Sequence, residues 1–510
     1  MPKLQENPVI QLHPSDNVAV ARQAIPAGTA VSAFDMVTGT DIPLGHKVSV
    51  REIAKGEPVR KNNTIIGWAV ETLPPGSHVH THNLQFNAVE NDFRFCADYK
   101  PVNVLPREQQ RTFQGFLRPD GQAGTRNCIA VVICSNCAAT VARKIAAHFT
   151  EDVLRAYPQV DAVVPLIHHT GCGLEKSGTP LTLLRRLLAG CIRNPNFAGA
   201  VVCALGCETN QIDAFFDEAG LTPGEMLRRL VIQEEGGSRK AVSRGIRMVE
   251  EMLPAANRAV RQALPVHYLK LGLECGGSDA FSGFSANPAL GRAVDLLVEH
   301  GGTAVFTEPT ELLGMEPALV RRARSPEVAE QILSVINWWV AYSKGRDSQI
   351  CGRVAPGNNA GGLSNVLEKA LGSAQKSGST PINEVVDYAE PVAGPGVVFM
   401  NAPSFDPLSS AAMFAGGCSL CAFTTGRGSC YGSLYLPTLK IASNTPLYMR
   451  QADDIDLNAG TIVDGTQSLE EAGLAIFEEL IQVASGKKTK SESFGMGSDE
   501  FVVWGRGITS

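Results

Sequence analysis

The chain has 510 residues, a net charge of −6, an isoelectric point near 6.0, 44% hydrophobic residues and a mean hydropathy near zero. This length predicts two to four domains, and the weakly acidic balance argues against a nucleic-acid or membrane-surface partner. We find no leader-like N-terminus and no apolar run of the roughly 18 residues that a membrane span needs. We therefore expect a cytoplasmic protein, in which the 13 cysteines are reduced.

The first part of the chain has the pattern of a small β-rich domain. Residues 1–95 contain short alternating apolar and polar runs that are separated by turns rich in Gly and Pro. Residues 96–117 are polar and show little periodicity, which predicts a linker.

Three histidines lie close together near the end of this β-rich part. His78, His80 and His82 occupy every second position of the segment GSHVHTHN. On a strand, side chains at this spacing project from the same face. Three such imidazoles can bind a Zn, Fe or Mn ion and leave room for water and substrate. A solvated edge strand without a metal is the alternative.

The remainder of the chain has the rhythm of an α/β protein. Apolar strands rich in Val, Ile and Ala are followed by loops of Gly, Cys, Ser or Thr and then by helical segments. Two series of this kind occupy residues 118–262 and 263–510. The predicted fold class is therefore α/β, with a small N-terminal β-rich domain followed by two α/β units that have mostly parallel sheets.

Ligands of open α/β sheets bind beyond the carboxyl ends of the strands, so the residues at these ends are the first candidates for a site. Four cysteines occupy predicted strand ends: Cys137, Cys172, Cys207 and Cys275. Thiolates that converge in this way would suit a tetrahedral metal ion or an iron–sulfur cluster. The alternative is that each cysteine is a small buried apolar residue.

Charged residues also follow predicted strands. Glu308 and Glu311 can act as bases or metal ligands, or simply begin a helix. Arg427 lies between Gly426 and Gly428, and a guanidinium beside exposed backbone amides suits a planar carboxylate or a phosphate. A surface-loop arginine is the alternative. Two further residues either cap a helix or contact a ligand: Ser278 and Asp279.

Several long motifs resemble those of the altronate dehydratase and galactarate dehydratase family. They are HVHTHN, DGQAGTRN, HHTGCG, CGGSDAFSG, APGNNAGGLSNVLEKALGSAQKSG, FTTGRGSCYG and DLNAGTI. The resemblance extends from about Asp16 to Ser485, and the histidine segment is more similar to the altronate branch. It implies that the N-terminal domain is of the SAF type and that the larger remainder is the dehydratase body.

The resemblance implies a metal-assisted hydro-lyase that converts D-altronate to 2-dehydro-3-deoxy-D-gluconate, with Fe²⁺ as cofactor and Mn²⁺ as a substitute. His168, Glu308 and Glu311 are then candidates for proton transfer, together with Arg427 for the substrate carboxylate. Residues expected to bind substrate are Arg126, Asn127, Ser278, Asp279, Asn358, Lys369, Gly426 and Gly428. Two positions depart from the family pattern: Asn359 replaces a lysine, and Thr170 replaces a tyrosine.

The sequence is also compatible with other functions. Galactarate or another sugar acid is an alternative substrate, and the same scaffold could eliminate sulfite from a sulfonated hydroxy acid. A non-enzymatic iron–sulfur redox or sensor protein would use the strand-end cysteines. The expected partner is a small-molecule sugar acid, and a homo-oligomer is compatible with the sequence.

Overall fold

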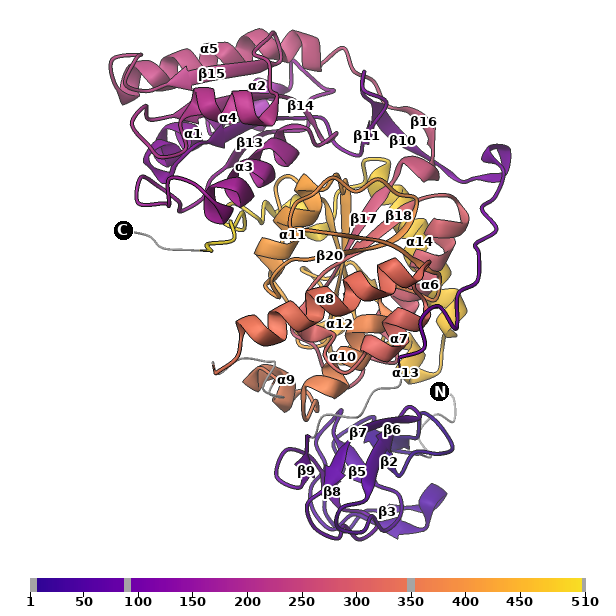
Figure 1. Cartoon of the computed structure of the whole chain (residues 1–510). Helices are drawn as coiled ribbons and strands as arrows, with labels where there is room; N and C mark the ends of the chain where they lie inside the picture. The colour runs from indigo at the N-terminus through magenta and orange to yellow at the C-terminus, as the bar shows by residue number, and fades with distance from the viewer. Residues whose placement is uncertain (1–6, 87–92, 346–353, 507–510) are drawn as a thin grey trace.

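The computed structural model describes residues 7–86, 93–345 and 354–506, and it contains three units built on different sheets (Figure 1). The N-terminal module, residues 7–86, consists of short antiparallel strands. One of its sheets has the order β1-β2-β5-β8, and a second has the order β6-β7-β9. The strands are β1 (Val9–Ile10), β2 (Val18–Ala21), β3 (Ala30–Val31), β4 (Met36–Val37), β5 (Lys47–Ser49), β6 (Pro58–Lys61), β7 (Thr64–Ala69), β8 (His78–Val79) and β9 (Leu84–Gln85).

The second unit, residues 128–256, has a four-stranded parallel sheet in the order β13-β12-β14-β15. Its strands are mostly apolar and buried because helices cover both faces: α1 and α5 pack on one, and α3 and α4 on the other. The elements are β12 (Cys128–Ile133), α1 (Ala139–Ala146), α2 (Glu151–Leu154), β13 (Val163–Leu166), α3 (Thr179–Ile192), β14 (Phe197–Ala204), α4 (Ile212–Ala219), β15 (Leu227–Val231) and α5 (Ser238–Ala256).

A small antiparallel sheet joins the second unit to the C-terminal one. Its order is β11-β10-β16, with β10 at Thr112–Leu117, β11 at Ala123–Gly124 and β16 at Gln262–Pro265. The end of the predicted linker is therefore a strand. Phe113 and Phe116 are buried in β10, and this pairing with a segment far along the chain was not visible in the local sequence.

The C-terminal unit, residues 266–506, is built on seven parallel strands in the order β19-β20-β18-β17-β21-β22-β23. Helices α6, α8 and α14 cover one face, and α11 packs on the other against α3 of the second unit. The strands are β17 (Lys270–Cys275), β18 (Thr303–Phe306), β19 (Ile382–Val386), β20 (Gly396–Met400), β21 (Leu420–Thr425), β22 (Thr438–Ala442) and β23 (Leu457–Asn458). The helices are α6 (Ala286–Glu299), α7 (Glu316–Arg321), α8 (Pro326–Tyr342), α9 (Pro356–Ala360), α10 (Val366–Gln375), α11 (Asp406–Ala415), α12 (Thr445–Arg450), α13 (Thr461–Asp464), α14 (Leu469–Ala484) and α15 (Lys490–Phe494).

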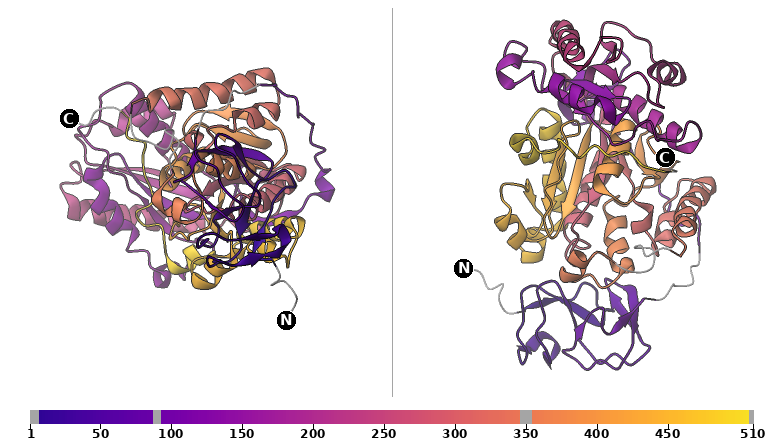
Figure 2. Two further views of the ribbon diagram at one scale, coloured as in Figure 1. Left: turned by 90° about the horizontal axis from the view of Figure 1, so that it is seen from below. Right: turned by 90° about the vertical axis from the view of Figure 1, so that its left-hand side faces the viewer.

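The three units are stacked along one direction (Figure 2, right). The second unit lies at one end, the seven-stranded sheet in the middle and the N-terminal module at the other end, below α9, α10 and α13. Across the described ranges 7–86, 93–345 and 354–506, no helix has both the length and the apolar composition that a bilayer crossing needs. The prediction of a β-rich N-terminal part followed by α/β units with parallel sheets is confirmed.

Candidate active site

The strand order of the C-terminal unit contains one reversal point. From β17 the chain builds outward through β18 and β20 on one side, and later through β21 and β22 on the other. The loops after β17 and β21 therefore lie side by side at the point where the chain turns to opposite sides of the sheet, and open α/β sheets bind their ligands at the carboxyl ends of such strands. These two loops meet through hydrogen bonds from the amides of Gly426 and Arg427 to the carbonyl oxygen of Gly277, at 3.0 and 2.7 Å.

Arg427 is exposed at this reversal point. The amides beside it are not free, because the Gly428 amide also donates to Oγ1 of Thr425, at 3.0 Å. Gly426 and Gly428 instead allow close packing: a Cβ atom on either would lie within 2.2 Å of Asp279 or Gln451. The guanidinium is thus the group in this loop that is left to face a ligand, which differs from our expectation of exposed amides.

Asp279 holds the loop after β17 in place. Its carboxylate accepts hydrogen bonds from Ser282, Ser443 and Asn444 at 2.7 to 2.9 Å, and burial raises its pKa. Ser278 beside it is also buried. With its acceptor positions occupied by protein donors, Asp279 supports the loop that carries the site.

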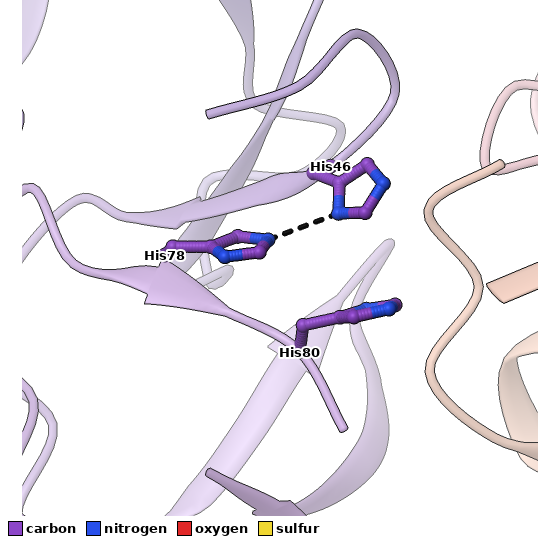
Figure 3. A group of neighbouring side chains, drawn as sticks. All are labelled: His46, His78 and His80. Atoms are coloured by element: carbon purple, nitrogen blue, oxygen red, sulfur yellow. Dashed lines mark hydrogen bonds between the residues drawn. The ribbon is translucent and has the colours of Figure 1, made fainter. Parts of the chain in front are cut away.

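The N-terminal module brings a cluster of imidazoles to the same edge. The ligand atoms of His46, His78 and His80 all lie within 4.8 Å of one another, and Nδ1 of His46 is 2.9 Å from Nε2 of His78 (Figure 3). Nε2 of His46 lies 3.3 Å from the carbonyl oxygen of Ala360. The next residue is Gly361, where a Cβ atom would lie 3.2 Å from Cδ of Arg427. One loop of the C-terminal unit therefore separates the imidazole cluster from Arg427.

The prediction that His78, His80 and His82 share one face of a strand is wrong. Strand β8 ends at Val79, and the chain turns, with the amide of Asn83 donating to the carbonyl oxygen of His80 at 3.1 Å. His82 is exposed beyond this turn; its ring centroid lies 5.3 Å from that of His78, but its nitrogens are not among those that lie within 4.8 Å of one another. His46, which precedes β5, takes the third position because β5 pairs with β8.

The imidazole cluster has the chemistry of a metal site. Burial lowers the pKa of His78 to about 4 and of His80 to about 3, aided by the charge of His46 and Lys47 respectively. The rings are therefore neutral at physiological pH, which is the form that binds a metal ion. Nδ1 of His80 is buried and has no hydrogen-bond partner, so a donor atom is available. These residues fit a divalent cation such as Fe²⁺ or Mn²⁺.

Helix α10 fastens the module to the C-terminal unit. Oε2 of Glu368 accepts from Nζ of Lys47 at 2.9 Å, and Oε1 accepts from Nζ of Lys61 at 2.7 Å; all three side chains are buried. Burial alone would raise the pKa of Glu368, but the two ammonium groups hold it well below the usual range. Lys47 also donates to the carbonyl oxygen of Gly362 at 2.8 Å. The module is thus docked beside the loop that approaches Arg427.

A second polar cluster lies beneath the same strand ends. Glu311 is paired with Lys369, whereas Glu308 accepts from Nζ of Lys376 at 3.0 Å. Cys275 is also buried here, with Sγ 3.2 Å from Nζ of Lys376. Burial, together with the charge of Glu311, raises the pKa of Glu308 to about 8.

Two further carboxyl groups, Glu274 and Asp406, complete this second cluster, and neither was predicted. Ligand atoms of Glu274, Glu308 and Asp406 lie within 4.8 Å of one another, as do those of Cys275, Glu308 and Glu311. Burial and the charge of Glu311 raise the pKa of Asp406 to about 6. Oε2 of Glu274 is buried and has no hydrogen-bond partner. The cluster can therefore store protons or hold a cation.

The four predicted cysteine ligands do not converge. Cys275 is buried in the C-terminal unit, whereas Cys137, Cys172 and Cys207 are exposed in the second unit. These two units have separate sheets, which explains why strand ends that look equivalent in sequence do not meet.

Three other candidates are held by structural contacts away from the C-terminal sheet edge. Arg126 forms a two-point ion pair with Glu492, at 2.7 and 2.9 Å. Nδ2 of Asn127 donates to the carbonyl oxygens of Gln159 and Ala256. His168 is buried in the second unit, where Nε2 lies 3.0 Å from the carbonyl oxygen of Ile133 and Nδ1 lies 2.7 Å from Oγ1 of Thr170. Burial lowers the pKa of His168 to about 4.

Helix α9 and the residues that follow it, as far as 363, contain the remaining candidates. Asn358 is buried, and Nδ2 of Asn359 donates to the carbonyl oxygen of Leu363 at 2.7 Å. The side chain of Asn359 therefore stabilises the turn after α9, in which Gly361 and Gly362 pack against Gly45 of the N-terminal module.

Comparisons with known proteins agree with this architecture. Residues 7–87 match the altronate/galactarate dehydratase SAF domain, 115–257 match the second domain of D-galactarate dehydratase/altronate hydrolase, and 266–509 match the D-galactarate/altronate dehydratase C-terminal domain.

Three curated relatives resemble the chain over most of its length. Altronate dehydratase of Bacillus subtilis (strain 168) is 33% identical over 509 residues, covering 98% of this chain and 99% of that protein. Galactarate dehydratase (L-threo-forming) of Escherichia coli (strain K12) is 35% identical over 506 residues, covering 96% of each. The (2R)-sulfolactate sulfo-lyase subunit beta of Chromohalobacter salexigens is 30% identical over 396 residues, covering 77% of this chain and 97% of that subunit. The chain therefore belongs to the altronate/galactarate dehydratase family of hydro-lyases.

Proposed function

We propose that the chain dehydrates D-altronate at C2 and C3, giving 2-dehydro-3-deoxy-D-gluconate and water, with a divalent cation, Fe²⁺ or Mn²⁺, as cofactor. Membership in a family of sugar-acid dehydratases supports the reaction type. The observation that carries the proposal is the meeting of the imidazole cluster with Arg427 across one loop at the carboxyl edge of the seven-stranded sheet.

The reaction places specific demands on this edge. Negative charge develops on the substrate carboxylate as the C2 proton leaves, so the site must supply a positive group beside it. The guanidinium of Arg427 can donate two parallel hydrogen bonds to a carboxylate. A divalent ion held by His46, His78 and His80 would supply Lewis acidity toward a substrate oxygen.

The second cluster offers a matched base and acid. Glu311, held by Lys369, takes the proton from C2. Glu308 keeps its proton at neutral pH because its pKa is about 8, and it gives that proton to the C3 hydroxyl, which leaves as water. The resulting enol becomes the keto acid when its hydroxyl proton is lost and C3 takes up a proton.

A second candidate function is elimination of sulfite from a sulfonated hydroxy acid. The similarity to a sulfo-lyase subunit favours it specifically, since that match covers nearly all of the subunit. The chemistry differs only in the leaving group, and Arg427 would again bind the carboxylate.

The test is product formation by the purified chain supplied with ferrous ion. D-Altronate, galactarate and (2R)-sulfolactate are offered separately, and 2-keto-3-deoxy acid and sulfite are measured. We expect keto acid from D-altronate. Keto acid from galactarate alone would correct the substrate, and sulfite release would favour the second candidate. No product from any of the three would contradict a lyase function.

A further inference from the structure

The second unit contains two classes of cysteine. Four of its thiols are buried in the sheet, directly after β12 or in α3, and burial raises the pKa of each: Cys128, Cys134, Cys191 and Cys203. Cys137, Cys172 and Cys207 are exposed instead. Cysteine is usually among the most buried residue types, so three exposed thiols in one unit call for a chemical explanation.

The three exposed thiols follow three adjacent strands. Cys137 comes after β12, Cys172 after β13 and Cys207 after β14, and β12 is the central one of these three strands. Because the strands are parallel, the loops that carry the thiols emerge at the same edge of the sheet. This is the edge at which such sheets bind ligands.

Hydrogen bonds join these loops directly beside the cysteines. The amide of Asn136 donates to the carbonyl oxygen of Thr170 at 2.8 Å, which links the Cys137 loop to the Cys172 loop. Oγ1 of Thr209 donates to the carbonyl oxygen of Cys172 at 2.9 Å, which links the Cys207 loop to the same point. The three thiols are therefore carried by loops in mutual contact.

The surroundings suit a bound inorganic group. A Cβ atom on Gly171 would have no neighbour within 4 Å, so there is open space beside Cys172. Nε2 of Gln233 lies 3.5 Å from Sγ of Cys207 and can donate a hydrogen bond that stabilises a thiolate. Among the described residues, the groups whose ligand atoms lie within 4.8 Å of one another do not include these thiols. The distances between the sulfur atoms of these three cysteines thus do not favour a single tetrahedral ion.

We propose that Cys137, Cys172 and Cys207 bind an iron–sulfur cluster of the [4Fe–4S] type. Bridging sulfides let such a cluster reach thiolates that are farther apart than the ligands of one ion. Each iron of the cube takes one external ligand, so three thiolates leave one iron for water or a small oxygen ligand. Among the cysteines that the structure describes, no other exposed thiol belongs to the second unit.

The assignment does not rest on the proposed dehydration, because it is tested without substrate. The full chain is reconstituted anaerobically with ferrous ion, sulfide and a thiol reductant, and iron, acid-labile sulfide and visible absorption are measured. We expect about four sulfide and about five iron per chain, four iron in the cluster and one on the imidazole cluster, together with a broad visible absorption. Iron on the imidazole cluster would add neither sulfide nor that absorption.

Serine variants locate the cluster. We expect Cys137→Ser, Cys172→Ser and Cys207→Ser each to lose most of the sulfide and the visible absorption. Cys430→Ser removes an exposed thiol of the C-terminal unit and should retain both. The replaced side chains are exposed, so the variants should fold, which circular dichroism checks. A wild-type chain that takes up iron without sulfide, or three cysteine variants that keep the cluster, would overturn the proposal.

Discussion

At the scale of single residues, the proposed metal site depends on three imidazoles, those of His46, His78 and His80, whose ligand atoms lie within 4.8 Å of one another. The spacing of GSHVHTHN predicted two of these residues, His78 and His80, as metal ligands. It also included His82, because alternation along a strand cannot reveal that the strand ends at Val79. His46 was missed because only the pairing of β5 with β8 brings it to the cluster.

The corrected cluster predicts which histidine matters for metal binding. His46→Ala should lose about one equivalent of bound Mn²⁺, because two imidazoles bind a divalent ion much more weakly than three. His82→Ala is the matched control: its ring lies beside that of His78, but its nitrogens are not among those within 4.8 Å of one another, so this variant should retain the ion. Mn²⁺ is chosen because it prefers nitrogen and oxygen ligands, so the exposed thiols contribute little. Isothermal titration calorimetry of both variants measures the bound Mn²⁺. Equal losses of Mn²⁺ in the two variants would contradict the assignment of His46 as a ligand.

The lowered pKa values of the cluster affect stability with a definite sign. His78 and His80 have a pKa near 4 and 3 when folded, whereas an unfolded histidine has a pKa near 6.5. The unfolded chain therefore binds more protons between these values. The contribution of these residues to stability is fully present above pH 6.5 and is lost as the pH falls toward 4 and 3.

At the scale of secondary-structure elements, the strand-end rule located the important loops but not their partners. The loops after β17, β18 and β21 were predicted, and the structure places them at one edge. Helix α10 could not be predicted as a connector. Its Glu368 meets Lys47 and Lys61, which lie in a different unit, and no local periodicity records such contacts.

The buried ion pairs of helix α10 lead to a prediction about stability. Glu368→Gln leaves two buried ammonium groups without a counter-charge, which should lower the free energy of unfolding by about 3–5 kcal/mol. Glu57→Gln removes a partner of Arg51 in the same module, where the arginine is 54% exposed, and should cost about 1 kcal/mol or less. Urea denaturation measures both variants, and equal effects would show that the buried ion pairs do not fasten the module.

At the scale of the whole molecule, the sequence predicted three parts and their fold class but not how they are stacked. Apolar strand composition identified both parallel sheets, since such strands are buried on both faces. The expectation that Cys275 joins Cys137, Cys172 and Cys207 failed because these thiols belong to different sheets. Similarly, Glu274 and Asp406 joined the second cluster through the packing of α11 against β17, which depends on tertiary structure.

Two separate sheet edges of the molecule carry the candidate functional side chains. The N-terminal module covers the carboxyl edge of the seven-stranded sheet, where the imidazole cluster, Arg427 and the second cluster lie. The exposed thiols are at the carboxyl edge of the other parallel sheet. We propose that substrate elimination takes place at the first edge.

Turnover of the Arg427→Ala variant tests this central assignment most directly. Loss of the guanidinium should lower kcat by roughly 10²- to 10³-fold, because charge developing on the substrate carboxylate would lose its paired donor. The thermal midpoint and Mn²⁺ binding should stay unchanged, since this side chain is exposed and is not one of the imidazole ligands. Arg155→Ala, which removes an exposed arginine of the second unit, should turn over normally. Near-normal kcat in the Arg427 variant, with wild-type protein active, would contradict the account.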